Sequence, residues 1–448
     1  MSTKLKDKLD SLDWIYSFWN SLSPYAYARA EDEVVILPPN LVYKTNRSGV
    51  QILDFLSKGG RLEDIPGFDC QKAFQVESFF LSLKAAYEGD SSGLEKVKYD
   101  FCFTKLPVLG EIALTYRCNN RCRFCYAGCG DDELNYCNIK VNECPELDTD
   151  GFKKIIDVFK NEAKIPFFSF TGGEPLLRTD LEELAAYACS LGLRVNLVSN
   201  GRLASPERAA SLFASGIKTA QVSLEAPYAE LHDYLCDAPG AFTDTVAGIK
   251  AMRDAGIAVQ TNSTLTSANR VALLDLPSFV ASLGVRRISM NLFIPVGSGA
   301  SEQKLVVPYK EAGSFIDKAR QKAMQAGLEF FWYSPIPMCI YNPVARGLGN
   351  KSCAACDGLL SVAPDGGLLP CSSWPEPVGN ILKDGFAKLW FSEKASWFKN
   401  KLYAPEPCKS CYAFSACQAA CPLYWNSMGY AELKDKKVRK NKRLDTAV

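Results

Sequence analysis

The chain of 448 residues contains eighteen cysteines but only one histidine. Disulfide scaffolds this rich in cysteine belong to short secreted chains, and no apolar signal segment follows the first residues, Met1 to Asp7. We therefore expect a cytosolic protein whose reduced thiols bind metal. Thiolate ligands with almost no imidazole suit zinc or iron–sulfur clusters, so the spacing of the cysteines has to decide between them.

The overall composition is that of a folded globular chain. Hydrophobic residues make up 47% of the sequence and charged residues 23%, so a large core can be buried. Lys and Arg number 51 and Asp and Glu number 50, a balance that gives no sign of nucleic-acid binding. No stretch approaches about 18 consecutive apolar residues, so we expect no membrane partner.

Strand and helix patterns alternate from about residue 110 to about residue 300. Apolar and β-branched runs predict strands at 111–115, 167–170, 195–198, 219–223, 259–263 and 287–291. Helical periodicity occupies the intervals 151–163, 181–191, 205–215 and 242–255. This repetition predicts an α/β fold with a parallel sheet, either open or curved into a partial (βα)6 barrel, and a site at the carboxyl ends of the strands.

A cysteine loop follows the first predicted strand. Cys118, Cys122 and Cys125 form a C-x3-C-x2-C pattern, and Tyr126 follows it directly. Three thiolates can hold three irons of a four-iron cubane and leave the fourth iron without a protein ligand. The alternative is a structural zinc site with Cys129 as its fourth ligand.

This loop, at the end of the first strand of a βα series, resembles the radical S-adenosylmethionine (SAM) superfamily. The resemblance implies a [4Fe–4S] cluster on the three cysteines, SAM on its open iron, and reductive cleavage of SAM to a 5′-deoxyadenosyl radical. It also implies a low-potential electron donor of the flavodoxin or ferredoxin type. The implied SAM contacts are Gly172, Gly173, Glu174, Pro175, Ser199, Asn200, Ser223 and Glu225.

The loop Thr171 to Pro175 matches the family's GGE-P motif, in which glycines admit the ligand to the backbone and a carboxylate pairs with an ammonium group. Glu225 stands where many relatives carry aspartate. We interpret the nearby His232 as structural rather than catalytic.

A second cysteine pattern occupies the last third of the chain. Cys356 and Cys371 flank Gly366 in C-x9-G-x4-C, Cys353 fits the same rule with twelve residues before the glycine, and a C-x2-C-x5-C-x3-C pattern follows at 408–421. This pattern resembles the SPASM extension of radical SAM enzymes, which carries two auxiliary iron–sulfur clusters. The family's crossed ligation implies a first set of Cys353, Cys356, Cys371 and Cys421 and a second set of Cys408, Cys411 and Cys417.

The second set lacks a thiolate, because no cysteine follows Cys421. A carboxylate, a cysteine from elsewhere or the substrate fills that position, or the second cluster is absent. A zinc ribbon on Cys408, Cys411, Cys417 and Cys421 is the alternative for this segment. Of the other cysteines, Cys129, Cys137 and Cys144 match no known site and are interpreted as buried thiols, with the missing ligand or another metal as alternatives. Cys70, Cys102, Cys189 and Cys236 are interpreted as ordinary residues.

The first 95 residues predict a small winged-helix-like module. Helical spacing over 9–22, 49–56 and 74–87 surrounds short strands at 33–37 and 41–43, and a polar segment at 89–98 reads as a linker. The module resembles the precursor-recognition element of ribosomal peptide maturases, which binds a leader peptide as an added strand at an exposed edge, here 34–37 or 41–43. DNA binding is the alternative, but the balanced charge does not support it.

Together these patterns predict a three-part cytoplasmic enzyme. Its parts are a recognition module at 1–95, a radical SAM partial barrel at 106–305 and a Cys-rich iron–sulfur domain at 306–448. It is expected to abstract hydrogen from a precursor peptide with a leader sequence and to form a carbon–carbon or thioether cross-link. The alternatives are maturation of a protein or of a tetrapyrrole or cofactor intermediate, and a non-enzymatic iron–sulfur scaffold or DNA binder. The sequence identifies no catalytic acid or base.

Overall fold

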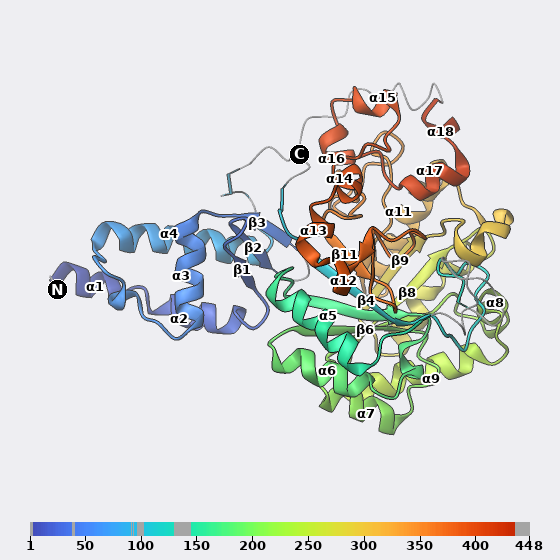
Figure 1. Ribbon diagram of the computed structural model, residues 1–448, viewed down its shortest axis with the longest axis horizontal. Coiled ribbons are helices and arrows are strands. Elements are labelled where there is room, and N and C mark those ends of the chain that lie inside the picture. Colours follow the sequence, from blue (N-terminus) through green and yellow to red (C-terminus); the bar gives the residue numbers. More distant parts are fainter. Residues whose placement is uncertain are drawn as a thin grey trace. The chain divides into compact units, whose positions relative to one another are not determined.

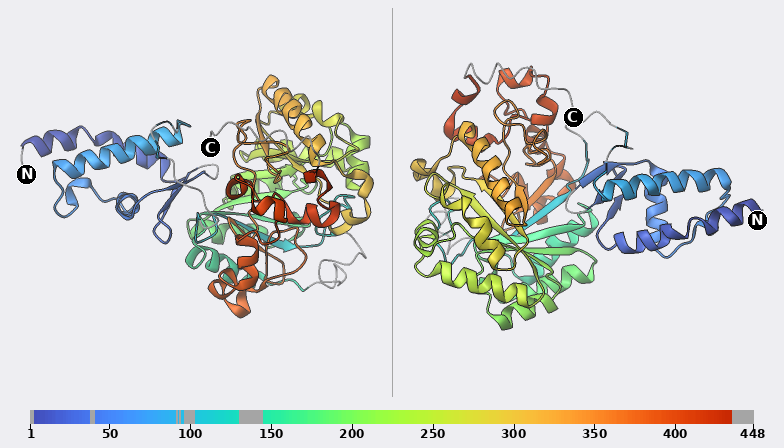
Figure 2. Two further views of the ribbon diagram at one scale, coloured as in Figure 1. Left: turned by 90° about the horizontal axis from the view of Figure 1, so that it is seen from above. Right: turned by 180° about the vertical axis from the view of Figure 1, so that it is seen from behind.

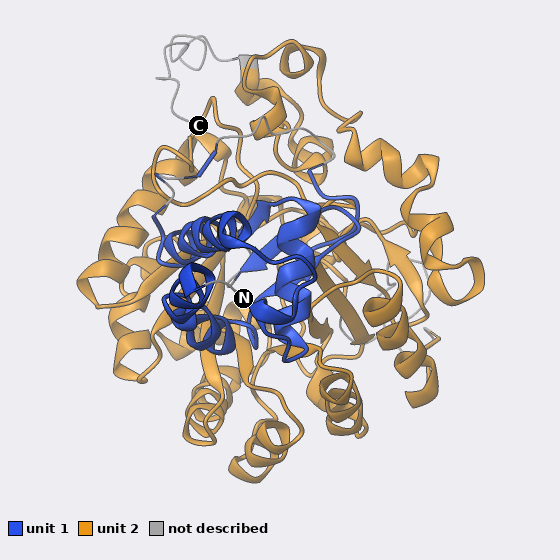
Figure 3. Ribbon diagram, turned by 90° about the vertical axis from the view of Figure 1, so that its left-hand side faces the viewer, with its two compact units in different colours: residues 1–108 blue, residues 109–448 orange. Residues whose placement is uncertain are grey.

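A computed structural model describes residues 3–37, 41–90, 92, 94–95, 103–129 and 145–434 (Figures 1 and 2). The chain divides into two compact units, residues 1–108 and residues 109–448 (Figure 3). The three domain ranges expected from the sequence stay predictions.

Unit 1 combines a small antiparallel sheet with helices. Its helices bury one apolar core, which includes Trp19, Leu53 and Phe80. The segment 9–22, expected as one helix, is interrupted at Ser11 and Leu12, where a turn separates α1 from α2. The elements are α1 (Thr3–Asp10), α2 (Asp13–Leu22), β1 (Tyr27–Arg29), β2 (Val34–Leu37), β3 (Leu41–Lys44), α3 (Arg47–Ser57), η1 (Leu62–Asp64) and α4 (Cys70–Tyr87).

The order of the strands decides which edge of this sheet can accept another strand. The order is β1-β2-β3, so β2 pairs on both sides and is buried at every position. The prediction that 34–37 is an exposed edge is therefore wrong, because its backbone groups are already paired. The strand β3 lies at the end of the sheet, and its residues are exposed or half-buried.

Unit 2 contains the six predicted parallel strands. They are β4 (Leu109–Thr115), β5 (Phe167–Gly172), β6 (Arg194–Ser199), β7 (Thr219–Ser223), β8 (Ala258–Leu265) and β9 (Arg287–Leu292). Each pairs in parallel with the next, which confirms the α/β partial barrel. One more parallel strand, β10 (Glu329–Trp332), extends the sheet beyond β9.

The helices of unit 2 lie around its strands (Figure 3). On the outer face of the sheet, α5 packs closely against β4 at Gly110. A Cβ at this position would lie 2.5 Å from the ring of Phe159 in α5. Alternation along β4 then points Glu111 and Ala113 to the inner face of the sheet. The helices are α5 (Thr149–Asn161), α6 (Leu181–Ser190), α7 (Pro206–Ala214), α8 (Ala229–Cys236), α9 (Ala241–Asp254), α10 (Leu276–Ser282) and α11 (Tyr309–Gln325), with 3₁₀ turns η3 (Pro175–Leu177), η4 (Ala272–Leu274), η5 (Gly297–Ser301) and η6 (Gln303–Leu305).

The cysteine-rich tail is continuous with this sheet. The strand β11 (Leu359–Val362) pairs in parallel with β4, and β12 (Gly367–Leu369) and β13 (Gly379–Asn380) follow antiparallel. Short helices complete the tail, coloured orange to red in Figure 1: α12 (Ile381–Asp384), α13 (Phe386–Trp390), α14 (Glu393–Lys399), α15 (Glu406–Lys409), α16 (Phe414–Cys417), α17 (Pro422–Met428) and α18 (Ala431–Lys434). Within the described ranges, no helix is both long and apolar enough to span a bilayer.

Candidate functional site

The cysteine loop after β4 is fixed by the end of a distant helix. The N–H groups of Arg121 and Arg123 donate to the carbonyls of Cys236 and Leu235, each at 3.0 Å. Cys236 is buried and packs against Cys122. Cys236, expected to be an ordinary residue, therefore lies beside one of the three predicted ligands.

Gly172 and Gly173 let the end of β5 approach the cysteine loop closely. A Cβ on Gly172 would lie 2.2 Å from the carbonyl oxygen of Thr115, and one on Gly173 would lie 2.2 Å from that of Arg117. Gly172 also has a φ of +125°. The N–H of Gly173 donates to Thr115 O at 2.7 Å, and the N–H of Glu174 donates to Arg117 O at 2.9 Å. Any side chain at these positions would push the two loops apart.

Glu174 joins the loop after β5 to the loop after β6. Its buried carboxylate accepts hydrogen bonds from Ser199 Oγ (2.8 Å), from the N–H of Asn200 (2.7 Å) and from the N–H of Leu176 (3.0 Å). Burial raises the pKa of Glu174, and these three donors oppose the shift. Pro175 is buried at the start of η3.

Asn200 connects this carboxylate to the cysteine loop. Its side-chain amide donates to Asn119 Oδ1 at 2.6 Å and lies 3.8 Å from the sulfur of Cys118. The guanidinium of Arg202, which the sequence did not single out, donates to Asn119 O (2.6 Å) and to Asn120 Oδ1 (2.9 Å). The predicted residues of the first three strand ends thus meet at one edge of the sheet.

The three sulfurs of the loop differ in their surroundings. The pKa of Cys125 is lowered to about 7, first because of its hydrogen bond with the thiol of Cys129 and further because backbone N–H groups point at its sulfur, although burial opposes the shift. The N–H of Cys129 is one of these donors, at 3.4 Å. Burial, and next the carboxylate of Glu174, raise the pKa of Cys118. Cys129 is a buried thiol, as expected, whereas Cys137 and Cys144 lie outside the described residues.

Ser223 and Glu225 follow at the end of β7. Ser223 is half-buried, whereas Glu225 is 1% exposed and accepts a hydrogen bond from the N–H of Thr264 at 2.7 Å. Burial raises the pKa of Glu225 to about 7. The N–H of Glu225 donates to Nδ1 of His232, which is buried in α8. This hydrogen bond connects α8 to the segment after β7, and the structural role of His232 stays a prediction.

The first auxiliary set gathers cysteines from three separate segments. Cys371 and Cys421 each lie near Cys353. Burial raises the pKa of both thiols, and the negative charge of the Cys353 thiolate raises it further. Burial also raises the pKa of Cys356 to about 12, with Cys353 again among the contributing neighbours. Cys421 is therefore close to the first set, whereas a zinc ribbon would place it with Cys408, Cys411 and Cys417.

An unusual backbone separates Cys417 from Cys421. Gln418, Ala419 and Ala420 all have left-handed conformations, with φ of 55°, 57° and 61°. Left-handed conformations cost about 1–2 kcal/mol for each non-glycine residue, so the surrounding structure has to hold them. It does so through Trp425, whose indole N–H donates to Ala419 O at 2.5 Å. This turn directs the two cysteines that flank it to different neighbourhoods.

Cys408, Cys411 and Cys417 form the second neighbourhood. Burial, followed by the thiolates of Cys417 and Cys411, raises the pKa of Cys408 to about 11. Cys411 is exposed, and Cys417 accepts a hydrogen bond from the N–H of Met338 at 3.3 Å. Nowhere in the described ranges do three His, Cys, Asp or Glu side chains converge on the position of a single metal ion.

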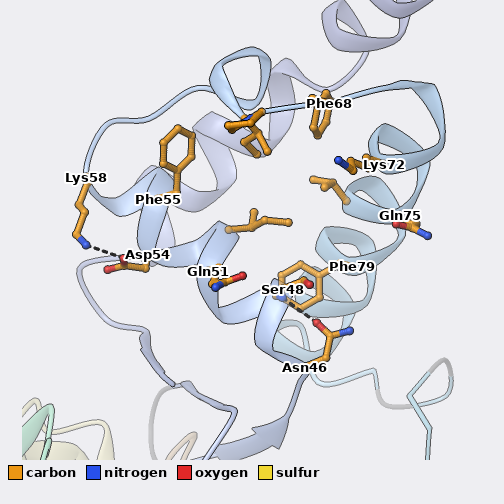
Figure 4. A pocket seen from close by; sticks show the side chains of 15 residues that line it. Asn46, Ser48, Gln51, Asp54, Phe55, Lys58, Phe68, Lys72, Gln75 and Phe79 are labelled. Atoms are coloured by element: carbon orange, nitrogen blue, oxygen red, sulfur yellow. Dashed lines mark hydrogen bonds and ion pairs between the residues drawn. The ribbon is translucent and has the colours of Figure 1, made fainter. Parts of the chain in front are cut away.

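Unit 1 has a cavity of its own, of about 920 Å³, between α3 and α4 (Figure 4). Phe55, Phe68 and Phe79 are among the apolar residues that line it, and Gln51 and Gln75 are among the polar ones. An ion pair between Asp54 and Lys58 lies at one side. The cavity can therefore take an apolar side chain and hydrogen-bond the groups beside it.

Comparison with known proteins identifies the family. The family described as "Radical SAM superfamily" matches residues 112–269, and the one described as "SPASM: Iron-sulfur cluster-binding domain" matches residues 353–412. An AdoMet-dependent heme synthase of Methanosarcina barkeri is 30% identical over 329 residues, which cover 68% of this chain and 87% of the synthase. The chain belongs to the radical SAM superfamily.

Other similar proteins are a peptide cyclase and a structure solved with a bound peptide. A PqqA peptide cyclase of Methylocella silvestris is 26% identical over 310 residues, 66% of this chain and 78% of the cyclase. Streptococcus suis SuiB, solved bound to the precursor peptide SuiA, has the same fold with a TM-score of 0.66 and 15% identity, covering 93% of this chain and 97% of SuiB. The resemblance to radical SAM enzymes with a SPASM extension is thereby confirmed.

The family also confirms the expected cofactors. A radical SAM domain binds a [4Fe–4S] cluster together with SAM, and a SPASM domain binds auxiliary iron–sulfur clusters. The described cysteines fit these groups, because their soft sulfur ligands form three separate neighbourhoods and the glycines of the β5 loop leave room beside the first. The chain is an enzyme of the SPASM maturase type.

Proposed function

We propose that Cys118, Cys122 and Cys125 hold the [4Fe–4S] cluster at the edge of the barrel. With SAM bound, this cluster supplies a carbon radical able to remove a hydrogen atom from a substrate. The proposed SAM contacts are those named from the sequence: Gly172, Gly173, Glu174, Pro175, Ser199, Asn200, Ser223 and Glu225. The hydrogen bonds that Glu174 accepts from Ser199 Oγ and from the N–H of Asn200 support this assignment, because they join three of the contacts into one rigid surface.

We further propose two auxiliary clusters in the tail. Cys353, Cys356, Cys371 and Cys421 hold the first, and Cys408, Cys411 and Cys417 belong to the second. The left-handed turn at 418–420 supports this division, since it separates Cys417 from Cys421. A low-potential flavodoxin or ferredoxin is the proposed electron donor.

The substrate that we propose is a tetrapyrrole or a similar cofactor intermediate. The observation that carries this proposal is the likeness to a heme synthase, which spans 87% of that enzyme at 30% identity. Peptide cross-linking, the activity first expected from the sequence, has less support because the peptide-cyclizing relative is 26% identical and is covered over 78% of its length. Maturation of an intermediate is therefore the better supported alternative.

A precursor peptide is the second candidate, and unit 1 favours it. The edge strand β3 can accept an extended leader, and the cavity between α3 and α4 can take an apolar side chain of such a peptide. The inner face of the barrel also carries neutral hydrogen-bonding groups, such as Asn196, which donates to Ser169 at 3.1 Å on the next strand. Such groups suit peptide amides better than the several carboxylates of a tetrapyrrole.

One anaerobic assay separates the two candidates. The full chain with SAM and dithionite receives either an iron coproporphyrin or the peptides encoded beside its gene, and 5′-deoxyadenosine and product mass are measured. Our proposal predicts a mass change in the coproporphyrin and more 5′-deoxyadenosine than without substrate. A mass change in a peptide alone would favour the second candidate and would contradict the first.

The edge strand offers a sharper test of the second candidate. N–H groups alternate along β3, so one of the neighbours Val42 and Tyr43 points its N–H away from β2. Replacing that residue with proline removes a hydrogen-bond donor from the edge of β3 that faces away from β2. The change should weaken leader binding in calorimetry, while SAM cleavage without substrate stays unchanged. Unaltered binding would exclude strand addition at β3.

A further inference from the structure

The second auxiliary set raises a question of ligand number. Cys408, Cys411 and Cys417 provide three thiolates, whereas a four-iron cluster has four iron corners to ligate. The family pattern would place the remaining cysteine after Cys421, where this chain has none. The fold instead places beside this set a cysteine that comes before it in the sequence.

Cys339 lies in a tight turn between β10 and β11. The N–H groups of Ile340 and Tyr341 both donate to Pro337 O, at 2.9 and 3.0 Å. The turn touches the second set directly, because the N–H of Met338 donates to the sulfur of Cys417 at 3.3 Å across 79 positions of sequence. The peptide group between Pro337 and Met338, one residue before Cys339, is therefore anchored on one of the proposed ligands.

The electrostatic surroundings of Cys339 identify its neighbours. The charged groups that act on its sulfur are Cys417, Cys408 and Cys411, in that order. All members of the second set thus lie near this sulfur. Their mutual repulsion as thiolates is relieved when iron cations lie among them.

The other described cysteines of unit 2 outside the proposed sets have other neighbours. Cys129 and Cys236 lie against the loop at the end of β4. Cys189 of α6 lies against Gly216, where an added Cβ would approach its sulfur to 2.4 Å. Among the described cysteines of unit 2, Cys339 is the one left to complete the second set.

We propose that Cys339 is the fourth ligand of the second auxiliary iron–sulfur cluster, with Cys408, Cys411 and Cys417. This inference rests on the proposed function of the tail. Four thiolates leave no iron open, so this cluster binds neither substrate nor solvent at an iron. Its role is then confined to holding the tail together and to exchanging electrons.

The test uses the full chain in a background that lacks the SAM cluster, with Cys118, Cys122 and Cys125 all changed to Ala. This background should hold about eight irons per chain in two cubanes. Adding Cys339→Ala should lower the iron content, either by the whole second cluster or by one iron with the EPR signal of an oxidised three-iron cluster. Cys189→Ala is the matched control and should leave iron content and EPR unchanged.

Two comparisons keep a failure of this inference distinct from a failure of the proposed function. Iron loss in Cys408→Ala without any change in Cys339→Ala would overturn the role of Cys339 and leave the auxiliary site intact. Unchanged iron in both variants would overturn the inference together with the second site.

Alkylation tests the same point without a substitution. In the unmodified holoenzyme, iodoacetamide should spare Cys339 and should modify it after the clusters are removed by a chelator and an oxidant. Cys70, in unit 1, serves as the control that reacts in both states. Modification of Cys339 at full iron content would contradict the proposal, and peptide mass spectrometry reads both sites.

Discussion

The SAM end of the barrel and the cysteine-rich tail build their sulfur sites in different ways. At the SAM end, one loop carries all three cysteines between 118 and 125, and two glycines press a neighbouring loop against it. In the tail, the proposed first set combines Cys353, Cys356 and Cys371 with Cys421, and the proposed second set combines 408–417 with Cys339. A strained turn at 418–420 separates Cys417 from Cys421. Cysteines that follow a known spacing pattern can be recognised from the sequence, whereas a cysteine outside the pattern, such as the proposed ligand Cys339, needs the fold.

The largest expected effects come from replacing either of the two cysteines that flank the strained turn, Cys417 and Cys421, with alanine. Cys421→Ala should remove the first auxiliary cluster, and Cys417→Ala should remove the second, each at a loss of about four irons per chain. The remaining cluster should keep its EPR spectrum in each case. Zinc release from Cys421→Ala with unchanged iron would instead support a zinc ribbon and would contradict the crossed arrangement.

A substitution that changes no cysteine should also disrupt the SAM-binding end of the barrel. Gly173→Ala places a methyl group against the carbonyl of Arg117 and should force the β5 loop away from the cysteine loop. We expect 5′-deoxyadenosine formation to fall at least about tenfold and the free energy of unfolding to fall by about 1–3 kcal/mol. Gly358→Ala is the control, since its nearest neighbour would be 3.9 Å away. Equal activity of the two variants would refute the role of this close approach.

The buried carboxyl of Glu225 should give the SAM end a pH dependence. Its pKa is raised to about 7 by burial, above the ordinary value of 4.5, so the folded chain holds a proton that the unfolded chain releases. This contribution to stability is complete below about pH 4.5 and is lost as the pH rises to about 7, at a cost of about 3 kcal/mol. Glu225→Gln should flatten that decline in denaturant unfolding, and an unchanged slope would contradict the assignment.

Much of the barrel could be predicted from the sequence, because each of the six strands is an apolar run next to a helical period. Several elements were missed, among them β10, β11 and α11. The strand β11 has four residues and is stabilised by pairing with β4, about 250 positions away, so local propensity carries little signal. The strand β10 is equally short, and α11 lies in a region predicted to belong to the iron–sulfur tail.

The candidate site likewise contains residues that the sequence could relate to one another and residues that only the fold brings together. The GGE-P loop and the cysteine loop could be related because both follow strand ends, and parallel strands end at one edge. Cys339 and Cys236 could not be found from spacing, since their partners lie about 80 and 110 positions away and only packing unites them. The break between α1 and α2 was missed because apolar periodicity continues across it.

The smallest expected effect tests whether the turn at 418–420 is strained. Ala420→Gly relieves a positive φ of 61° but removes a buried methyl group, so its net effect on the free energy of unfolding should be within about 1 kcal/mol of zero. Ala209→Gly, at a buried position in α7, should cost about 2 kcal/mol because helix propensity and burial are both lost. Equal losses in the two variants would mean that the turn stores no strain.

The most direct test of the account compares SAM cleavage in the unmodified chain and in the variant with Cys118, Cys122 and Cys125 all changed to Ala. Both are reconstituted anaerobically and reduced with dithionite, and 5′-deoxyadenosine is measured together with iron. We predict that the variant forms no 5′-deoxyadenosine but keeps about two thirds of the iron, since the auxiliary sites are separate. Continued 5′-deoxyadenosine formation by the variant would contradict the assignment of the SAM cluster to this loop.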